Sequence, residues 1–298
     1  MVIMEFRTDL ALENKEELGG NVPRGVTVDE LSIGRARITR IRVENEEGAA
    51  ALSRPKGNYI TIEVPPFSDT AGEIDERLTA VSTELAKLLP EEGEILVAGL
   101  GNSDITPDAL GPKAAARVLA TRHISGELAR SAGLGDLRKV SVVSPGVLGQ
   151  TGIETGELLA GIAEKTHPAA VIAVDALASR RLSRLGCTIQ ISDTGISPGS
   201  GVGNHRQEIS RKTLGVPVIA VGVPTVVDAA TLVCDLAGAT DEERSRLKAA
   251  VEPRGASMVV TPREIDLLID RAADMVSLGI NQALHPHILP EDMKMLVG

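Results

Sequence analysis

From residue 95 onward, short apolar runs alternate with amphipathic stretches, and this alternation restricts the possible folds more than any other feature of the sequence. The apolar runs include Ile95–Gly99, Ala170–Val174 and Val216–Val221, and stretches with helical spacing lie between them. Strands that are separated by helices are joined by crossovers and pair in parallel. The sequence therefore predicts an α/β protein of one domain, a three-layer α/β/α fold with a mostly parallel sheet.

The aromatic content supports this class of fold. The chain has two Phe, one Tyr and no Trp, so its core must be built from Val, Ile, Leu and Ala. Small and β-branched side chains suit strands that are buried on both faces and helices that pack closely on them.

Charge and hydropathy exclude several classes of protein. Lys and Arg number 31 against 41 Asp and Glu, a formal net charge of −10, and no basic cluster is interleaved with aromatic residues. This composition argues against direct nucleic-acid binding. No apolar run approaches the roughly 18 residues that a membrane span needs. The acidic N-terminus does not resemble a signal peptide, so we expect a cytoplasmic chain with no membrane partner.

Local patterns give more specific expectations. Residues 1–57 read as mainly irregular, with one strand near Arg37–Val43. The spacing predicts helices over Asp108–Ala120, over Ala176–Arg184 and from Thr225. A last helix is expected over Pro262–Ala283, because Thr261, Pro262 and Glu264 form a capping box with proline at the first helical position.

Two aspartates follow predicted strands, where ligands bind in open α/β sheets. Asp108 falls in the first turn after a Thr106 N-cap, and Asp175 falls at the end of Ala170–Val174. Each has a structural explanation, since carboxylates complement helix dipoles and cap helices. If the two converge, repulsion raises one pKa and gives an acid and a base that activate water. The same pair could instead hold a divalent metal.

Two further segments are weaker candidates. Asp193-Thr194-Gly195 spells the triplet of pepsin-like proteases, but those enzymes are all-β and need two triplets, so we expect Asp193 at most to line the cleft. The glycine-rich loop with Gly199, Gly201 and Gly203 could bind an anion or an oxyanion through backbone N–H groups. It lacks the ending of a P-loop. No HExxH or CxxC spacing predicts a preformed zinc site.

Long stretches of the chain resemble the germination proteases of endospore-forming bacteria. They include GLGNSDITPDALGPKA (Gly99–Ala114), VIAVDALASR (Val171–Arg180), TIQISDTGISPGSGVGNHRQEIS (Thr188–Ser210) and LGVPVIAVGVPTVVDA (Leu214–Ala229), and further matches cover nearly the whole chain. The resemblance implies an α/β fold shared with hydrogenase maturation endopeptidases. It also implies an atypical aspartic-type endopeptidase, with Asp108 and Asp175 as its catalytic pair and no cofactor.

The resemblance further implies the biological setting. Family members degrade small acid-soluble spore proteins in the spore core and are homotetrameric zymogens that trim their own N-terminus. The processing sequence has an acidic residue, an apolar residue and then Ala, which TDLALE (Thr8–Glu13) fits. The expected cut is Asp9–Leu10, leaving residues 1–9 as a propeptide and residues 10–298 as one peptidase domain.

Cleavage after an acidic residue requires cationic or hydrogen-bond donors in the pocket, and we expect Arg180, His205 and Arg206 there. Two alternatives remain at this stage. One is a metal-assisted peptidase of the hydrogenase-maturation type, in which the same carboxylates hold a cation. The other is a non-enzymatic module that binds an anion at the glycine-rich loop.

Overall fold

The computed structural model describes residues 8–297 apart from residues 20, 70–74, 200–205, 239–242, 244–245, 248–249 and 252–257. The apolar and β-branched runs of this part of the chain form one sheet, in the order β1-β2-β3-β7-β8-β6-β4-β5, with β9 paired to β8. The strands are β1 Val26–Ile33, β2 Ala36–Val43, β3 Gly57–Glu63, β4 Ile95–Gly99, β5 Val140–Val143, β6 Ala170–Ala178, β7 Thr188–Ser192, β8 Val218–Asp228 and β9 Val259–Val260.

The sheet is mixed. Strands β5, β4, β6 and β8 pair in parallel, and they are the strands that the alternating pattern predicts. From β8 the sheet continues antiparallel through β7, β3, β2 and β1. The parallel half therefore forms one edge of carboxyl-terminal strand ends, where sites of α/β proteins lie.

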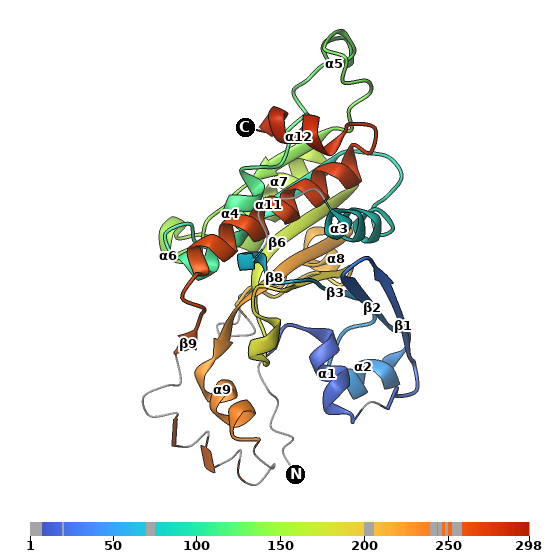
Figure 1. Ribbon diagram of the computed structural model, residues 1–298. Coiled ribbons are helices and arrows are strands. Elements are labelled where there is room, and N and C mark those ends of the chain that lie inside the picture. Colours follow the sequence, from blue (N-terminus) through green and yellow to red (C-terminus); the bar gives the residue numbers. More distant parts are fainter. Residues whose placement is uncertain are drawn as a thin grey trace.

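Helices cover both faces of the sheet (Figure 1). On one face, α3, α4 and α11 pack against the sheet in the larger apolar cluster; on the other, α7 and α8 close a smaller one. The α/β class with two helical layers is thus confirmed. The helices are α1 Ala11–Glu17, α2 Glu46–Leu52, α3 Glu76–Ala86, α4 Leu110–Ala115, α5 Gly126–Ser131, α6 Leu148–Thr151, α7 Thr155–Thr166, α8 Arg211–Leu214, α9 Ala229–Leu236, α11 Ile265–Leu284 and α12 Pro290–Val297.

The N-terminal region is more ordered than the sequence indicates. Strands β1 and β2 form a hairpin, and β3 extends it to β7. Helices α1 and α2 pack beside this hairpin in a third apolar cluster that contains Leu12, Leu52 and Tyr59. The expectation of an irregular region was wrong because β1 (VTVDELSI) is half polar and gains its stability from pairing with β2.

Three helix boundaries also differ. Strand β6 runs to Ala178 and β8 runs to Asp228, so no helix spans Ala176–Arg184 or begins at Thr225. Both strands extend because they pair with each other beyond Asp175. Helix α11 begins at Ile265 without the expected capping box, and the Thr261 hydroxyl donates instead to the Thr225 carbonyl.

Candidate active site

The loop after β4 carries Asp108 in the short 3-10 turn η2 (Thr106–Asp108), followed by α4 rather than by one long helix. The Leu100 N–H donates to the Val174 carbonyl of β6 at 2.8 Å. Gly101 has a φ of +111°, and a Cβ there would lie 2.1 Å from the Asp108 carbonyl oxygen. Because only glycine tolerates this approach, the sequence Gly99-Leu100-Gly101 lets the loop fold over Asp108.

The Asp108 carboxylate is held by the backbone of this loop. Its Oδ2 accepts a hydrogen bond from the Asn102 N–H at 2.7 Å. The Thr225 hydroxyl of β8 donates to the Pro107 carbonyl at 2.8 Å and so ties η2 to the sheet. Burial raises the pKa of Asp108 above its ordinary value.

Asp175 lies inside β6 and is 4% exposed. Its Oδ1 accepts a hydrogen bond from the Ala176 N–H at 2.9 Å. It does not cap a helix, since β6 continues past it. Burial raises its pKa well above the ordinary value, and the nearby charges of Asp108 and Asp9 raise it further.

The structure brings Asp108 and Asp175 to one cavity of about 280 Å³, at the carboxyl ends of the parallel strands. Two carboxyl groups whose environments differ in this way divide into a base and an acid. Burial raises the pKa of Asp175 further than that of Asp108, so Asp175 is the better candidate for the acid and Asp108 for the base. The cavity is also lined by Asp9, Leu100, Gly101, Thr155, Gly156, Leu177, Ala178, Gly199, Arg206 and Thr225.

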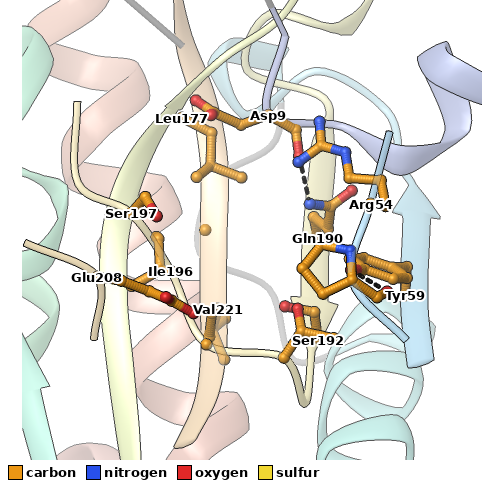
Figure 2. A pocket seen from close by; sticks show the side chains of 15 residues that line it. Asp9, Arg54, Tyr59, Leu177, Gln190, Ser192, Ile196, Ser197, Glu208 and Val221 are labelled. Carbon is orange, nitrogen blue, oxygen red and sulfur yellow. Dashed lines mark hydrogen bonds between the residues drawn. The ribbon is translucent and has the colours of Figure 1, made fainter. Parts of the chain in front are cut away.

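The N-terminal segment (Thr8–Glu17) reaches this cavity. Asp9 pairs with Ala178 at the end of β6, because its N–H donates to the Ala178 carbonyl at 2.9 Å and its Oδ2 accepts from the Ala178 N–H at 2.8 Å. Asp9 also lines a second cavity, of about 210 Å³, that is bordered by Gln190 and Tyr59 (Figure 2). The backbone before the Asp9–Leu10 bond thus lies between the two cavities.

Gln190 is a residue that the sequence analysis did not single out. Its Nε2 donates to the Asp9 carbonyl oxygen at 2.7 Å, and its Oε1 accepts from the Ala11 N–H at 2.8 Å. Its one sequence signal is a polar side chain between two isoleucines, in a strand whose residues are all buried.

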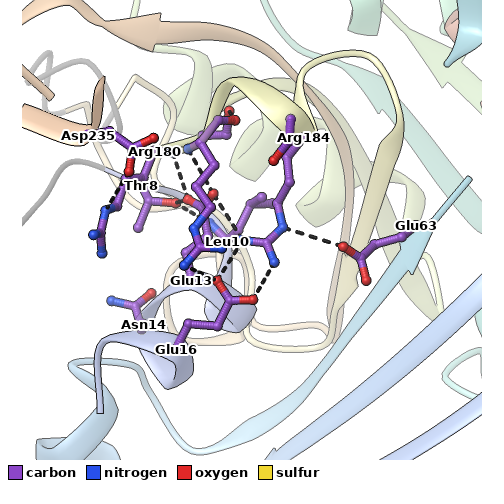
Figure 3. Close-up of polar contacts among 12 residues, drawn as sticks. Thr8, Leu10, Glu13, Asn14, Glu16, Glu63, Arg180, Arg184 and Asp235 are labelled. Atoms are coloured by element: carbon purple, nitrogen blue, oxygen red, sulfur yellow. Dashed lines mark hydrogen bonds and ion pairs between the residues drawn. The ribbon is translucent and has the colours of Figure 1, made fainter. Parts of the chain in front are cut away.

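Helix α1 is anchored by its acidic side chains on the loop after β6 (Figure 3). The buried carboxylate of Glu13 accepts from the N–H groups of Arg180 and Arg181 at 2.7 and 3.0 Å and from Arg184 Nη1 at 3.2 Å. Glu16 forms a two-pronged ion pair with Arg184 at 2.5 and 3.0 Å. This cluster fixes Leu10 and Ala11, both fully buried, beside the cavity.

The other predicted residues separate into three groups. Arg180 lies outside the cavity lining and pairs with Glu17 at 2.7 Å and Asp235 at 3.8 Å. Asp193 lines neither cavity, because its carboxylate accepts from the N–H and side-chain amide of Asn58 at 2.7 and 2.6 Å. Both side chains thus bind partners away from the two cavity linings, and their roles in the pocket and the cleft stay predictions.

The third group lies in the glycine-rich loop. Arg206 lines the larger cavity and faces Glu154 of the opposite wall at 3.8 Å. Gly199 lines the same cavity with a φ of +74°. Gly201, Gly203 and His205 lie outside the described residues.

Two properties of the described residues bear on membrane and metal-binding functions. No helix there is long and apolar enough to cross a membrane. In the same part of the chain, three or more His, Cys, Asp or Glu side chains do not gather as metal ligands. The described side chains at the aspartate pair thus do not make up a ligand set of this size.

The sequence matches the family model described as germination protease over residues 8–239 and 236–296. A germination protease of Caldanaerobacter subterraneus is 44% identical, over 100% of this chain and 99% of the relative. Those of Clostridium perfringens and Priestia megaterium are 42% and 36% identical, each over 96% of this chain and over 97% and 95% of the relatives.

A solved structure, the NiFe hydrogenase maturation protease HycI of Thermococcus kodakarensis, covers 67% of this chain and 98% of its own, with 18% identity and a TM-score of 0.38. A likeness of that size is too weak to support an inference. The family match and the three relatives extend over almost the whole chain. The chain belongs to the germination protease family.

Proposed function

We propose that this peptidase is an aspartic-type endopeptidase made as a zymogen, which cuts its own Asp9–Leu10 bond and uses Asp108 and Asp175 to activate water. One observation carries the proposal: Asp9 lines the same cavity as the two aspartates. The residue before the predicted cut thus borders the cavity that holds the two proposed catalytic groups, which supports the proposal.

The reaction needs a base for water and an acid for the leaving nitrogen. An ionised Asp108 takes a proton from water as the water oxygen attacks the Asp9 carbonyl carbon. Asp175 gives its proton to the Leu10 nitrogen, the C–N bond breaks, and Asp9 becomes a new carboxyl terminus. The proton on Asp108 then returns to Asp175 through solvent, which restores the starting state.

The substrates and the assembly follow from the family resemblance. We infer that the processed enzyme acts on small acid-soluble spore proteins in the spore core and works as a homotetramer without a cofactor. Light scattering of the purified chain tests the assembly, and a monomer under all conditions would contradict it.

The principal test uses the purified full-length chain and a small acid-soluble spore protein. Wild type is compared with Asp108→Asn, Asp175→Asn and the control Asp104→Asn, an exposed carboxylate of the same loop. Removing a general acid or base should slow both self-processing and substrate cleavage by about 10²- to 10⁴-fold, while the control cleaves normally. Wild-type rates in either active-site variant would exclude the pair.

Mass spectrometry of the product identifies the bond, since the released peptide should be residues 1–9. A cut elsewhere would refute the assignment of Asp9–Leu10. Chelator treatment separates this mechanism from a metal-assisted one: activity that is lost in chelator and restored by a divalent cation would assign the two carboxylates to a metal.

A further inference from the structure

Gln190 and Asp175 lie in one row across three strands. Gln190 of β7 is paired with Gly222 of β8, and Gly222 is paired with Asp175 of β6. Directly paired residues of neighbouring strands point to the same face of a sheet. The amide and the carboxyl group therefore project from the same face, on either side of a residue with no side chain.

The absence of a side chain at Gly222 makes room for the side chain of Leu177. A Cβ at this position would lie 2.6 Å from Leu177 Cγ and 2.7 Å from the Asp175 carbonyl oxygen. Leu177 in turn lines both cavities, together with Asp9. Gln190, Gly222 and Leu177 line the smaller cavity, which Asp9 of the N-terminal segment also lines.

The Gln190 amide spans the Asp9–Leu10 bond. Its donor end holds the Asp9 carbonyl oxygen and its acceptor end holds the Ala11 N–H, so both ends are satisfied by the peptide. Gln190 is 8% exposed. A buried amide that loses such a partner is destabilised, and release of residues 1–9 would leave its N–H group free for the carbonyl of another peptide.

Ala178 makes two further contacts with the residue before this bond. Its carbonyl and N–H bind the Asp9 backbone and carboxylate, respectively. A hydrogen bond from N–H to a carboxylate is stronger than one to a neutral oxygen. This arrangement favours an acidic side chain at position 9. Arg180 pairs with Glu17 of the N-terminal segment.

We propose that Gln190 is a catalytic residue that donates to the carbonyl oxygen of the scissile bond, and that the Ala178 N–H forms the subsite for the acidic residue before it. The inference rests on the proposed function and deepens it. As water adds to the carbonyl carbon, negative charge develops on the oxygen that Gln190 Nε2 already contacts. The site serves Asp9 first and the acidic residue of a substrate afterwards.

Two substitutions in the full-length chain separate the donor from the acceptor of Gln190. Gln190→Met removes both, and Gln190→Glu keeps an acceptor for the Ala11 N–H but loses the donor. Gln282→Met is the matched control, because Gln282 lies in α11 and lines neither cavity. The readouts are the rate of self-processing and, in an Asp175→Asn background that prevents it, hydrogen exchange at the Ala11 amide.

The donor role predicts that both Gln190 variants process about 10²- to 10³-fold more slowly, as for loss of one oxyanion donor. Only Gln190→Met should also speed Ala11 exchange, by about tenfold, as for loss of one hydrogen bond. Wild-type processing in Gln190→Glu would overturn the donor role. Equal Ala11 exchange rates in Gln190→Met and Gln282→Met would show that Gln190 does not hold the Ala11 N–H.

These readouts also distinguish the inference from the function on which it rests. If the wild-type chain never cuts its own N-terminal segment, the proposed function fails. The exchange measurement alone then tests whether Gln190 holds the Ala11 N–H. A set of peptides tests the subsite: peptides with Asp or Glu before the bond should be cleaved, and matched Asn and Gln peptides at least tenfold less well. Equal cleavage of both kinds would refute the acidic subsite.

Discussion

Replacing Glu13 with Ala should loosen the N-terminal segment without unfolding the sheet. Glu13 is 1% exposed, and its carboxylate is the shared acceptor for two backbone N–H groups and for Arg184. The variant removes this acceptor from a site that water does not reach. The partly buried N–H groups of Arg180 and Arg181 would then lose their charged partner.

The size of the effect follows from these contacts. A hydrogen bond to a charged group contributes about 1.5–3 kcal/mol. Arg184 keeps Glu16 and Glu63, so the loss comes mainly from the two backbone donors. We therefore expect docking of the segment to weaken by about 3–5 kcal/mol, the range for a broken buried pair. This corresponds to a roughly 10²- to 4×10³-fold larger undocked population.

Hydrogen exchange at the Ala11 amide measures this population directly, in the Asp175→Asn background. Exchange that proceeds through undocking should accelerate by the same factor. Glu46→Ala is the control, because its side chain is 84% exposed and pairs only at the surface with Lys56; it should change stability by less than about 1 kcal/mol. Ala11 exchange in Glu13→Ala no faster than in Glu46→Ala would refute the reasoning.

Three further predictions concern Asp175, Gly222 and Asp9. Because the pKa of Asp175 is raised in the folded state, its favourable contribution to folding stability is complete below the ordinary aspartate pKa and is lost as pH rises through the raised value. Asp175→Asn should thus raise Tm at pH 7 and reduce the decrease of Tm with rising pH. An unchanged pH dependence of Tm would contradict this. Gly222→Ala should cost about 1–3 kcal/mol in urea unfolding, because its Cβ would meet Leu177. Gly161→Ala, inside α7 with open space around it, should instead stabilise by up to about 1 kcal/mol, and the same sign for both would refute the packing argument. Asp9→Asn should slow self-processing at least tenfold by mass spectrometry, and normal processing would show that the Asp9 charge is not recognised.

The parts of the fold that depend on local patterns could be predicted. The run Ala170–Val174 is apolar throughout, and it forms a strand buried on both faces. The continuation of that strand to Ala178 depends on pairing with β8, about fifty residues away, which local periodicity cannot register. Thr261 failed as a helix cap for the same reason, since a carbonyl of β8 competes for its hydroxyl.

The site shows the same division between local and distant information. Strand ends directed attention to Asp108 and Asp175, and the structure places both at one cavity. The partners of Arg180 could not be predicted, because nothing in the local sequence shows that the fold brings Glu17 and Asp235 to this side chain. Gln190 was missed because the two backbone groups that it holds lie about 180 residues earlier in the chain.

The way in which Asp9 is held also bears on the protonation of Asp175. The Ala178 N–H binds the Asp9 carboxylate, and the charge of Asp9 acts to raise the pKa of Asp175. An acidic residue at this position therefore does two things in the proposed mechanism, since it fits the donor at the end of β6 and helps to keep the proton on the acid that must protonate the leaving nitrogen. A neutral residue of the same shape would lose both effects at once, which is why we expect selectivity for an acidic residue to appear in kcat as well as in KM.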